Sequence, residues 1–148
     1  MEAHPDFKEL FVLLNKHKVD YIIVGGYAMA FHGAPRLTGD IDILVSQQSE
    51  NADRILDAPN EFGFASAGLT KKDFTTPSKI IQLGVPPIRV DFVTSLTGVT
   101  WEKAVAIRVP GNYGNVPVFF IGRDEFIANK RAMGRKRDLA DIEALGEE

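Results

Sequence analysis

Residues 20–45 read DYIIVGGYAMAFHGAPRLTGDIDILV, and they contain the clearest structural pattern in the chain. The apolar run at the start predicts a buried strand that ends in Gly25 and Gly26, and residues 27–32 have the composition of a short helix. Residues 40–43 then alternate polar and apolar side chains and continue into the apolar pair Leu44 and Val45, which predicts a second strand. The expected order is therefore strand, glycine turn, helix, strand.

Asp40 and Asp42 lie on one face of the second predicted strand, because successive side chains of a strand point in opposite directions. Two like charges held this close on a mostly buried strand repel each other, and proton sharing or a divalent cation relieves the repulsion. We favour the cation. The later run IRVDFV (88–93) places Asp91 on the face opposite its neighbouring apolar residues, so an adjacent strand would supply a third oxygen ligand.

Gly25 and Gly26 favour a phosphate ligand next to these carboxylates. Glycines allow a backbone to approach a ligand closely, and the N–H groups at a helix start attract phosphate. Mg²⁺ is usually held by one or two carboxylates together with substrate phosphates. The three aspartates and the glycine turn therefore predict Mg²⁺ and a nucleoside triphosphate.

The stretch from Gly25 to Asp42 resembles the G-G/S-x(n)-D-x-D signature of the DNA polymerase β-like nucleotidyltransferase superfamily. The Gly-Gly, the pair Arg36 and Thr38, and the Asp-Ile-Asp are most similar to small (minimal) bacterial and archaeal nucleotidyltransferases that include AbiEii-type toxins of toxin–antitoxin systems. Many members of the superfamily have serine at the position of Gly26. Backbone N–H groups and Thr38 would replace that hydroxyl here.

Two further parts of the chain match motifs of that superfamily. Its members carry a third acidic residue on a later strand, which Asp91 matches. They also carry a lysine on a C-terminal helix followed by a Lys-Arg-Asp-x-x-Asp element, matched here by Lys130 and residues 136–141. The resemblance therefore touches residues from about 20 to 142.

The resemblance implies an α/β (α+β) nucleotidyltransferase fold, in which helices flank a mixed, twisted sheet mainly on one side and the metal site lies on a sheet edge facing a cleft. Asp40 and Asp42 would bridge two Mg²⁺ ions, and Asp91 would hold the second ion and take the acceptor's proton. The phosphates of an NTP such as ATP would bind to five residues: Gly25, Gly26, Arg36, Thr38 and Lys130. Arg137 and Asp141 are candidates for acceptor contacts or for an ordinary helix face.

Composition agrees with a compact enzyme domain. At 148 residues we expect one domain over 1–148, with 45% hydrophobic and 25% charged residues, as in globular chains. There is no cysteine, which suits a reducing cytoplasm. The chain start has no signal-peptide pattern, and Gly25 and Gly26 interrupt the longest apolar stretch, so we expect a cytoplasmic protein without a membrane segment. The net charge of −3 argues against generic nucleic-acid adhesion.

The other expected elements follow from periodicity and from turn residues. We expect helices near Phe7–Leu14 and over 49–58, the latter ended by Pro59, and a loop or weak strand over 60–76. Further expected elements are strands over 79–85, 88–93, 106–109 and 116–121, a turn over 111–115, and helices over 101–104, 123–133 and 135–145. Trp101 is interpreted as core packing rather than as a stacking platform.

Two other function classes fit parts of the pattern. A nucleotide-sensing or partner-binding module would keep the fold without turnover, but the presence of all three aspartates argues against it. A two-metal nuclease would use the same carboxylates without needing the Gly-Gly turn. The acceptor stays open between RNA such as a tRNA end, a protein side chain and a small molecule such as an antibiotic. Its recognition is expected from residues 60–76, the basic stretch 130–137 or a partner such as an antitoxin.

Overall fold

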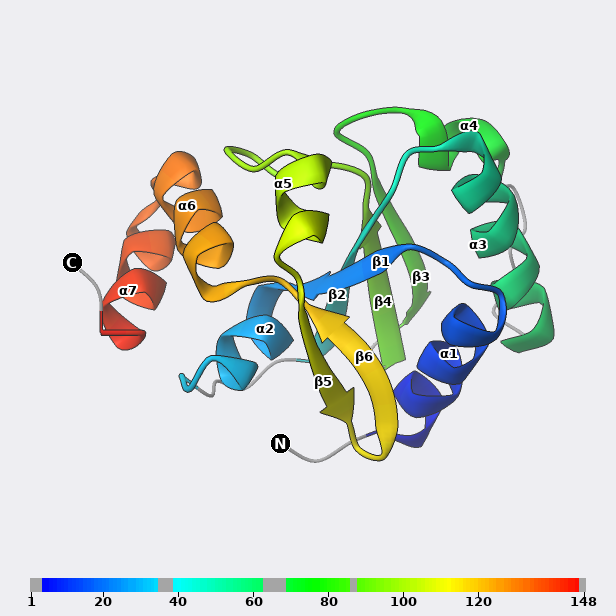
Figure 1. The fold of residues 1–148 in the computed structure, drawn as a ribbon, viewed down its shortest axis with the longest axis horizontal. Helices are drawn as coiled ribbons and strands as arrows, with labels where there is room; N and C mark the ends of the chain where they lie inside the picture. The colour runs from blue at the N-terminus through cyan, green and yellow to red at the C-terminus, as the bar shows by residue number, and fades with distance from the viewer. Residues whose placement is uncertain (1–3, 35–38, 63–68, 86–87, 147–148) are drawn as a thin grey trace.

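The computed structural model describes residues 4–34, 39–62, 69–85 and 88–146, which form a mixed sheet with helices around it (Figure 1). The six strands lie in the order β3-β4-β2-β1-β6-β5. Their bounds are β1 Tyr21–Val24, β2 Asp40–Val45, β3 Ile80–Val85, β4 Ile88–Val93, β5 Val109–Tyr113 and β6 Val116–Phe120. The pairs β1–β6 and β2–β4 are parallel, and the other three pairs are antiparallel. The mixed sheet expected from the sequence is therefore confirmed.

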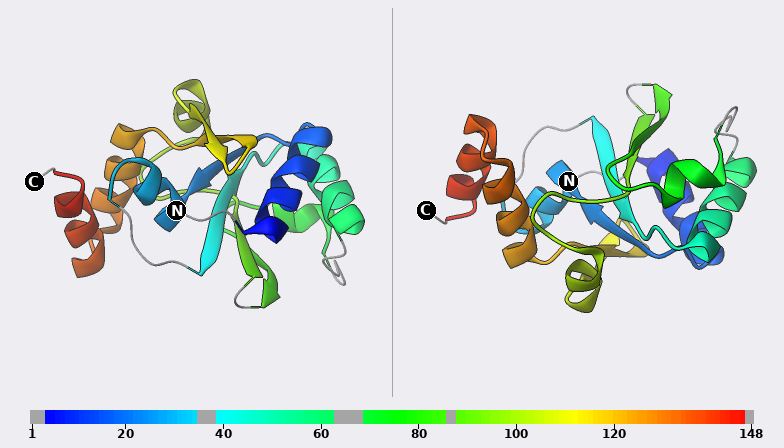
Figure 2. Two further views of the ribbon diagram at one scale, coloured as in Figure 1. Left: turned by 90° about the horizontal axis from the view of Figure 1, so that it is seen from below. Right: turned by 90° about the horizontal axis from the view of Figure 1, so that it is seen from above.

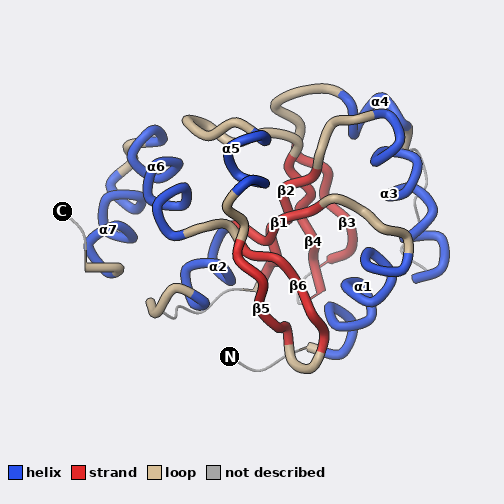
Figure 3. Tube along the Cα trace, in the orientation of Figure 1, coloured by secondary structure: helices blue, strands red, loops and turns tan. Residues whose placement is uncertain are grey.

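Helices lie at both ends of the molecule. Their bounds are α1 Pro5–Lys16, α2 Gly25–Phe31, α3 Ser49–Phe62, α4 Lys71–Thr75, α5 Trp101–Ala106, α6 Arg123–Met133 and α7 Lys136–Ala144. Figures 1 and 2 show α6 and α7 together at one end, with α1 and α3 at the other, and Figure 3 shows the strands between them. Within the described ranges, no helix combines the length and apolar character needed to span a bilayer.

Aromatic contacts fix α1 and α2 on one face of the sheet. Phe11 of α1 lies 5.7 Å from the ring of Tyr21 on β1, and Phe31 of α2 stacks on Phe120 of β6 at 4.1 Å. Tyr21 is three residues from Val24, which pairs with Asp42, so alternation places the aromatic contacts and the aspartates on opposite faces. The expectation that helices cover mainly one side agrees with these contacts, and it leaves the aspartate face available for a site.

The expected helix end before Pro59 is wrong. Helix α3 continues through this proline to Phe62 instead of ending at Ala58. A proline inside a helix removes one backbone hydrogen bond, crowds the carbonyl four residues earlier and disfavours helical geometry in the residue before it, but a helix can still run through it as a kinked helix. The expected loop or weak strand over 60–76 is also wrong at its end, because Lys71–Thr75 forms α4 with a capping box between Thr70 and Asp73. Residues 63–68 lie outside the described residues.

The hairpin of β5 and β6 begins later than its sequence indicates. The strand expected over 106–109 runs over Val109–Tyr113 instead, and the turn is confined to Gly114 and Asn115. Gly114 has a φ of 61°, the left-handed conformation that a two-residue hairpin turn requires. The glycines and asparagines of 111–115 predicted a turn over this whole segment, whereas Gly111 lies inside the strand. A side chain there would meet Phe31 and Phe120, so this glycine makes room for their stacking.

Candidate active site

The three predicted aspartates lie on two neighbouring parallel strands. Asp42 of β2 is the direct register partner of Asp91 of β4, and Asp40 is the partner of Arg89. Val90 and Phe92 are fully buried on the opposite face, as their alternation predicted. The strands β2 and β4 are inner strands of the sheet, so the expectation of a site at a sheet edge is wrong. The long-range pairing of these strands brings together carboxylates that lie about 50 positions apart in the chain.

Arg89 is a residue of this site that the sequence reasoning did not single out. Its Nη2 lies 2.8 Å from Oδ2 of Asp40 and 3.1 Å from Oδ2 of Asp91. The guanidinium therefore balances two of the three carboxylates. The available signal was the alternation of β4, which places Arg89 and Asp91 on the same face two residues apart.

Asp42 lies in an environment that disfavours its charged form. Burial, followed by the charges of Asp91 and Asp40, raises its pKa to about 6, against the smaller opposing effects of Lys130 and Arg89. Asp91 is 8% exposed, and its buried Oδ1 atom has no hydrogen-bond partner among the residues that the structure describes. A buried acceptor without a donor and a carboxyl group with a raised pKa are both relieved by a bound cation.

The residues therefore fit a divalent cation chemically, although they are not gathered around a common point. Among the described side chains, no three His, Cys, Asp or Glu residues form a group spaced to hold a metal ion. Arg89 is placed where it attracts two of the candidate ligands. Binding of a metal by Asp40, Asp42 and Asp91 would require the guanidinium to move away and the carboxylates to converge.

Gly25 sets how closely the backbone approaches Asp42. Its φ is +67°, and a Cβ atom at this position would lie 2.9 Å from Cγ of Asp42 and still closer to Oδ2. Gly25 and Gly26 form the first residues of α2, at the end of β1, as the predicted glycine turn required. Glycine is therefore required at position 25 for two reasons: the backbone has a positive φ, and a Cβ atom would collide with the Asp42 carboxylate. Arg36 and Thr38, the other predicted phosphate ligands of this segment, lie outside the described residues.

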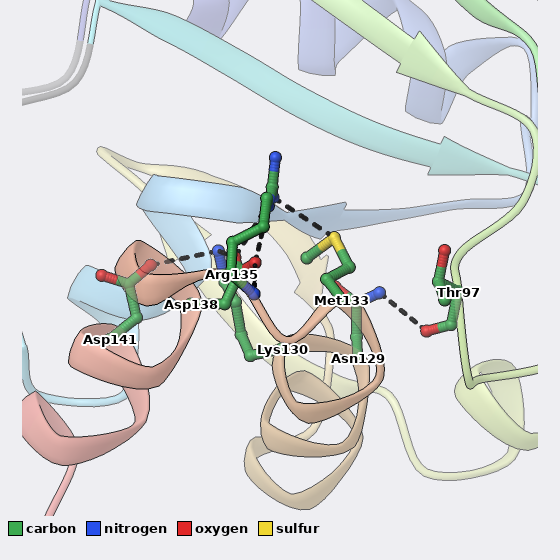
Figure 4. A network of polar contacts seen from close by, with 7 residues as sticks. All are labelled: Thr97, Asn129, Lys130, Met133, Arg135, Asp138 and Asp141. Atoms are coloured by element: carbon green, nitrogen blue, oxygen red, sulfur yellow. Dashed lines mark hydrogen bonds and ion pairs between the residues drawn. The ribbon is translucent and has the colours of Figure 1, made fainter.

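Lys130 faces the site from α6 but is engaged in ion pairs with α7. Its Nζ lies 3.1 Å from Oδ2 of Asp141 and 3.5 Å from Oδ1 of Asp138 (Figure 4). The helix breaks at Gly134, whose φ of 66° ends α6 in a left-handed cap, so α7 turns back against α6. Lys130 and Asp141 are therefore brought together by a helical hairpin and not by the spacing of one continuous helix.

Asp138 is the centre of this hairpin. The side chain is fully buried and accepts hydrogen bonds from the backbone N–H, Nε and Nη2 of Arg135 (Figure 4). These bonds, and to a lesser degree the charge of Lys130, lower its pKa to about 2. Asn129 donates to the carbonyl of Thr97 at 2.8 Å and so ties α6 to the segment after β4. The sequence placed Asp138 in the Lys-Arg-Asp-x-x-Asp element without indicating its role, and gave no signal for Asn129, since the partners of both are set by the break at Gly134 and by tertiary packing.

A cleft of about 740 Å³ connects these groups. The aspartate face of the sheet forms one wall, and α6 and α7 form the other. Its lining includes seven of the predicted residues: Gly25, Gly26, Asp40, Asp42, Lys130, Arg137 and Asp141. Asp91 lies below this surface, paired with Asp42. The cleft also contains Lys79, which directly precedes β3, and Arg135, which directly precedes α7, and both add positive charge to its lining.

We predict that Asp138→Ala destabilises the protein strongly. The substitution removes three hydrogen bonds from Arg135 and one ion-pair partner of Lys130, which should lower the free energy of unfolding by about 2–4 kcal/mol. Urea unfolding at neutral pH measures this change. Glu143→Ala, an exposed position on the same helix, is the matched control and should change stability by less than about 0.5 kcal/mol. Equal midpoints for both variants would show that the Asp138 network does not stabilise the hairpin.

The fold is similar to those of two solved structures. No protein-family model and no curated protein matches the chain. A solved structure of a proposed nucleotidyltransferase from Thermotoga maritima is similar, with a TM-score of 0.64, 19% identity, and coverage of 93% of this chain and 88% of the other. An antigenic nucleotidyltransferase-like protein from Paracoccidioides brasiliensis gives a TM-score of 0.53, 18% identity, and coverage of 97% and 75%. At these identities the likeness shows the fold: the chain has a nucleotidyltransferase fold, as its glycine and aspartate motifs predicted.

Proposed function

We propose that this protein transfers a nucleotidyl group from an NTP to an acceptor and releases pyrophosphate. The observation that carries the proposal is the pairing of Asp42 with Asp91 on adjacent strands, at a cleft that also contains Gly25 and Gly26. The likeness of the fold to the two nucleotidyltransferase structures supports it. A nuclease would need the carboxylates but not a glycine held against one of them.

Each part of the cleft has a role in this reaction. Asp40, Asp42 and Asp91 would hold two Mg²⁺ ions, which would neutralise phosphate charge and activate the acceptor oxygen. A carboxylate oxygen of Asp91 would take the acceptor's proton. The backbone of Gly25 and Gly26 would approach the phosphates, where side chains would obstruct them.

Five residues remain the predicted phosphate ligands: Gly25, Gly26, Arg36, Thr38 and Lys130. Of these, Lys130 is the cation that lines the described cleft. Lys130 can serve the triphosphate only by exchanging its contacts with Asp138 and Asp141 for phosphate oxygens. Such an exchange would couple nucleotide binding to the α6–α7 hairpin.

Arg89 should oppose metal binding in the nucleotide-free protein. Because the guanidinium contacts Asp40 and Asp91, Arg89→Gln removes a competing positive charge, and the affinity for Mn²⁺ should rise roughly tenfold. Titration calorimetry on the nucleotide-free protein measures this affinity. Arg89→Lys keeps the charge and should show a smaller increase. An unchanged Mn²⁺ affinity in the glutamine variant would show that the metal does not use these carboxylates.

One assay tests the activity. The protein is incubated with Mg²⁺, each α-labelled NTP in turn and a cell extract, and both pyrophosphate release and the labelled species are measured. Incorporation of label supports transfer and identifies the acceptor, with ATP as the first nucleotide to test. Release of labelled fragments from RNA without incorporation would support the nuclease.

The ion pairs of the nucleotide-free protein support a second candidate function. Arg89 and Lys130 already balance the acidic residues around the cleft, which also favours a nucleotide-sensing or partner-binding module without turnover. Nucleotide binding without pyrophosphate release would identify that module.

The narrower proposal is a toxin of the AbiEii kind with an antitoxin partner. It rests on the sequence motifs alone. Growth arrest on expression, lost in an Asp42→Asn variant, would support a toxin, and co-purification of a protein that restores growth would identify the antitoxin.

A further inference from the structure

A second cleft of about 510 Å³ lies next to the proposed active site. It is formed by the end of β2, the segment after β4 and the start of α5. Ser95 and Leu96 line both clefts, so the two are joined along a common wall. Its volume falls within the range of small-molecule sites, roughly 300–1,000 Å³. It suits a compact ligand better than a folded partner.

The floor of the second cleft continues the strand that carries the aspartates. Leu44 lies in this cleft, two residues beyond Asp42 on the same face of β2. At roughly 3.3 Å per residue, two positions of a strand span about 7 Å. A ligand bound over Leu44 would therefore reach Asp42 and its partner Asp91 with a group at its end.

The inner wall of this cleft is preformed. Ser46 and Thr94 are buried, and both hydroxyl groups have partners: Ser46 Oγ accepts from the N–H of Gln48, and Thr94 Oγ1 accepts from the N–H of Lys79 and donates to the carbonyl of Thr76. By contrast, Trp101 is half-buried at the start of α5, and Gln48 and Glu102 are exposed at the rim. The rim therefore offers an aromatic ring, an amide and one carboxylate for a ligand. Part of the Trp101 side chain packs against the core, as the sequence predicted, and the rest lines the second cleft.

The charges of the two clefts differ. The first cleft contains Lys79, Lys130, Arg135 and Arg137, which suit a triphosphate. Within the described part of the chain, no Lys or Arg lines the second cleft, and Glu102 is its only charged residue. A phosphate-bearing ligand would have no cation to meet there, and Glu102 would repel it. Hydroxyl groups, and an amine beside Glu102, suit the available partners.

We propose that the second cleft is the acceptor site and that it takes a small polyhydroxylated molecule without phosphate groups. This inference rests on the proposed nucleotidyl transfer. A hydroxyl oxygen of the acceptor would form a bond to the α-phosphorus as the bond from that phosphorus to the bridging oxygen of pyrophosphate breaks. The hydroxyl proton would pass to Asp91, and pyrophosphate would leave through the first cleft. The basic stretch 130–137 would then serve the triphosphate rather than a phosphate-rich acceptor.

The single tryptophan of the chain makes the cleft directly observable. Trp101 emission is followed while the full chain is titrated with glucose, with glucosamine or with a short oligoribonucleotide, each at low and high salt. We expect saturable changes with the two sugars, tighter binding of glucosamine, and no saturable change with the oligoribonucleotide. Glu102→Gln should weaken glucosamine binding roughly tenfold by removing a charge-assisted contact, while binding of glucose should change little. Lys103→Ala, exposed on the same helix outside the cleft, is the matched control.

Two sets of outcomes separate this inference from the proposed activity. No saturable change with either sugar, or a salt-dependent response to the oligoribonucleotide, overturns the proposed acceptor class. A Gln48→Trp variant, which fills the rim of the cleft, should lose transfer of label to a sugar. Label transferred to RNA or protein, with an unchanged rate in this variant, also overturns the inference but leaves nucleotidyl transfer intact. Sugar binding without label transfer from any NTP supports the cleft and counts against the activity.

Discussion

Replacing Asp42 by asparagine is expected to reduce nucleotidyl transfer by roughly a thousandfold, a loss of about 4 kcal/mol of transition-state stabilisation. Asp42 is the register partner of Asp91, and burial holds its carboxylate close to two others. The asparagine keeps the size of the side chain but removes the charge that would hold a cation. Pyrophosphate release under saturating NTP and Mg²⁺ measures the loss. Undiminished turnover with a matching thermal melt would remove Asp42 from the proposed metal site.

The same substitution should stabilise the free protein at neutral pH. Because the folded-state pKa of Asp42 is raised from 3.8 to about 6, the folded state binds this proton more tightly than the unfolded state. The free energy of unfolding contributed by this group therefore rises by about 1–3 kcal/mol as pH falls from above 6 to below 4. Asp42→Asn should have this added stability at pH 7 and lose that part of the pH dependence. The exposed variant Asp57→Asn is the control and should keep the wild-type profile.

Gly25→Ala is expected to cost both stability and activity. The backbone there has a φ of +67°, which costs an alanine about 1–2 kcal/mol, and the new methyl group would press on the Asp42 carboxylate. Displacing this carboxylate by about 1 Å should lower transfer roughly a hundredfold. Urea unfolding and pyrophosphate release measure the two effects separately.

Gly39→Ala is the matched control for this prediction. Gly39 precedes Asp40 and has no positive φ, and a Cβ atom there would have no neighbour within 4 Å in the described part of the chain. Its stability should change by less than about 0.5 kcal/mol, and its transfer rate should stay close to that of the wild type. Equal behaviour of the two alanine variants would show that the contact between Gly25 and Asp42 has no role in the site.

Local patterns in the sequence were enough to identify most strands and the candidate ligands. The alternation around Asp40 and Asp42 predicted their common face, and the run IRVDFV predicted a strand with Asp91 on the face opposite Val90 and Phe92. Gly25 and Gly26 marked the junction of β1 and α2 for a related reason, since the backbone turns there with a positive φ. These features depend on neighbours within a few positions, which the sequence contains directly.

Local patterns failed where two signals competed. Pro59 suggested the end of a helix that continues, and Gly111 suggested a turn inside what is a strand. In both places the packing of the whole element outweighs the preference of one residue. The sequence contains the preference but not the packing.

Local residue patterns are sufficient to predict the order of elements around residues 20–45, the shared face of Asp40 and Asp42, and the motifs that resemble nucleotidyltransferases. Long-range packing decided that Asp42 pairs with Asp91, that Arg89 contacts two carboxylates, and that Lys130 meets Asp138 and Asp141 across a helical hairpin. It also decided that a second cleft without Lys or Arg among its described lining residues joins the first. The physical reason is that pairing between strands distant in sequence, and the angle between α6 and α7, depend on burying apolar surface of the whole chain.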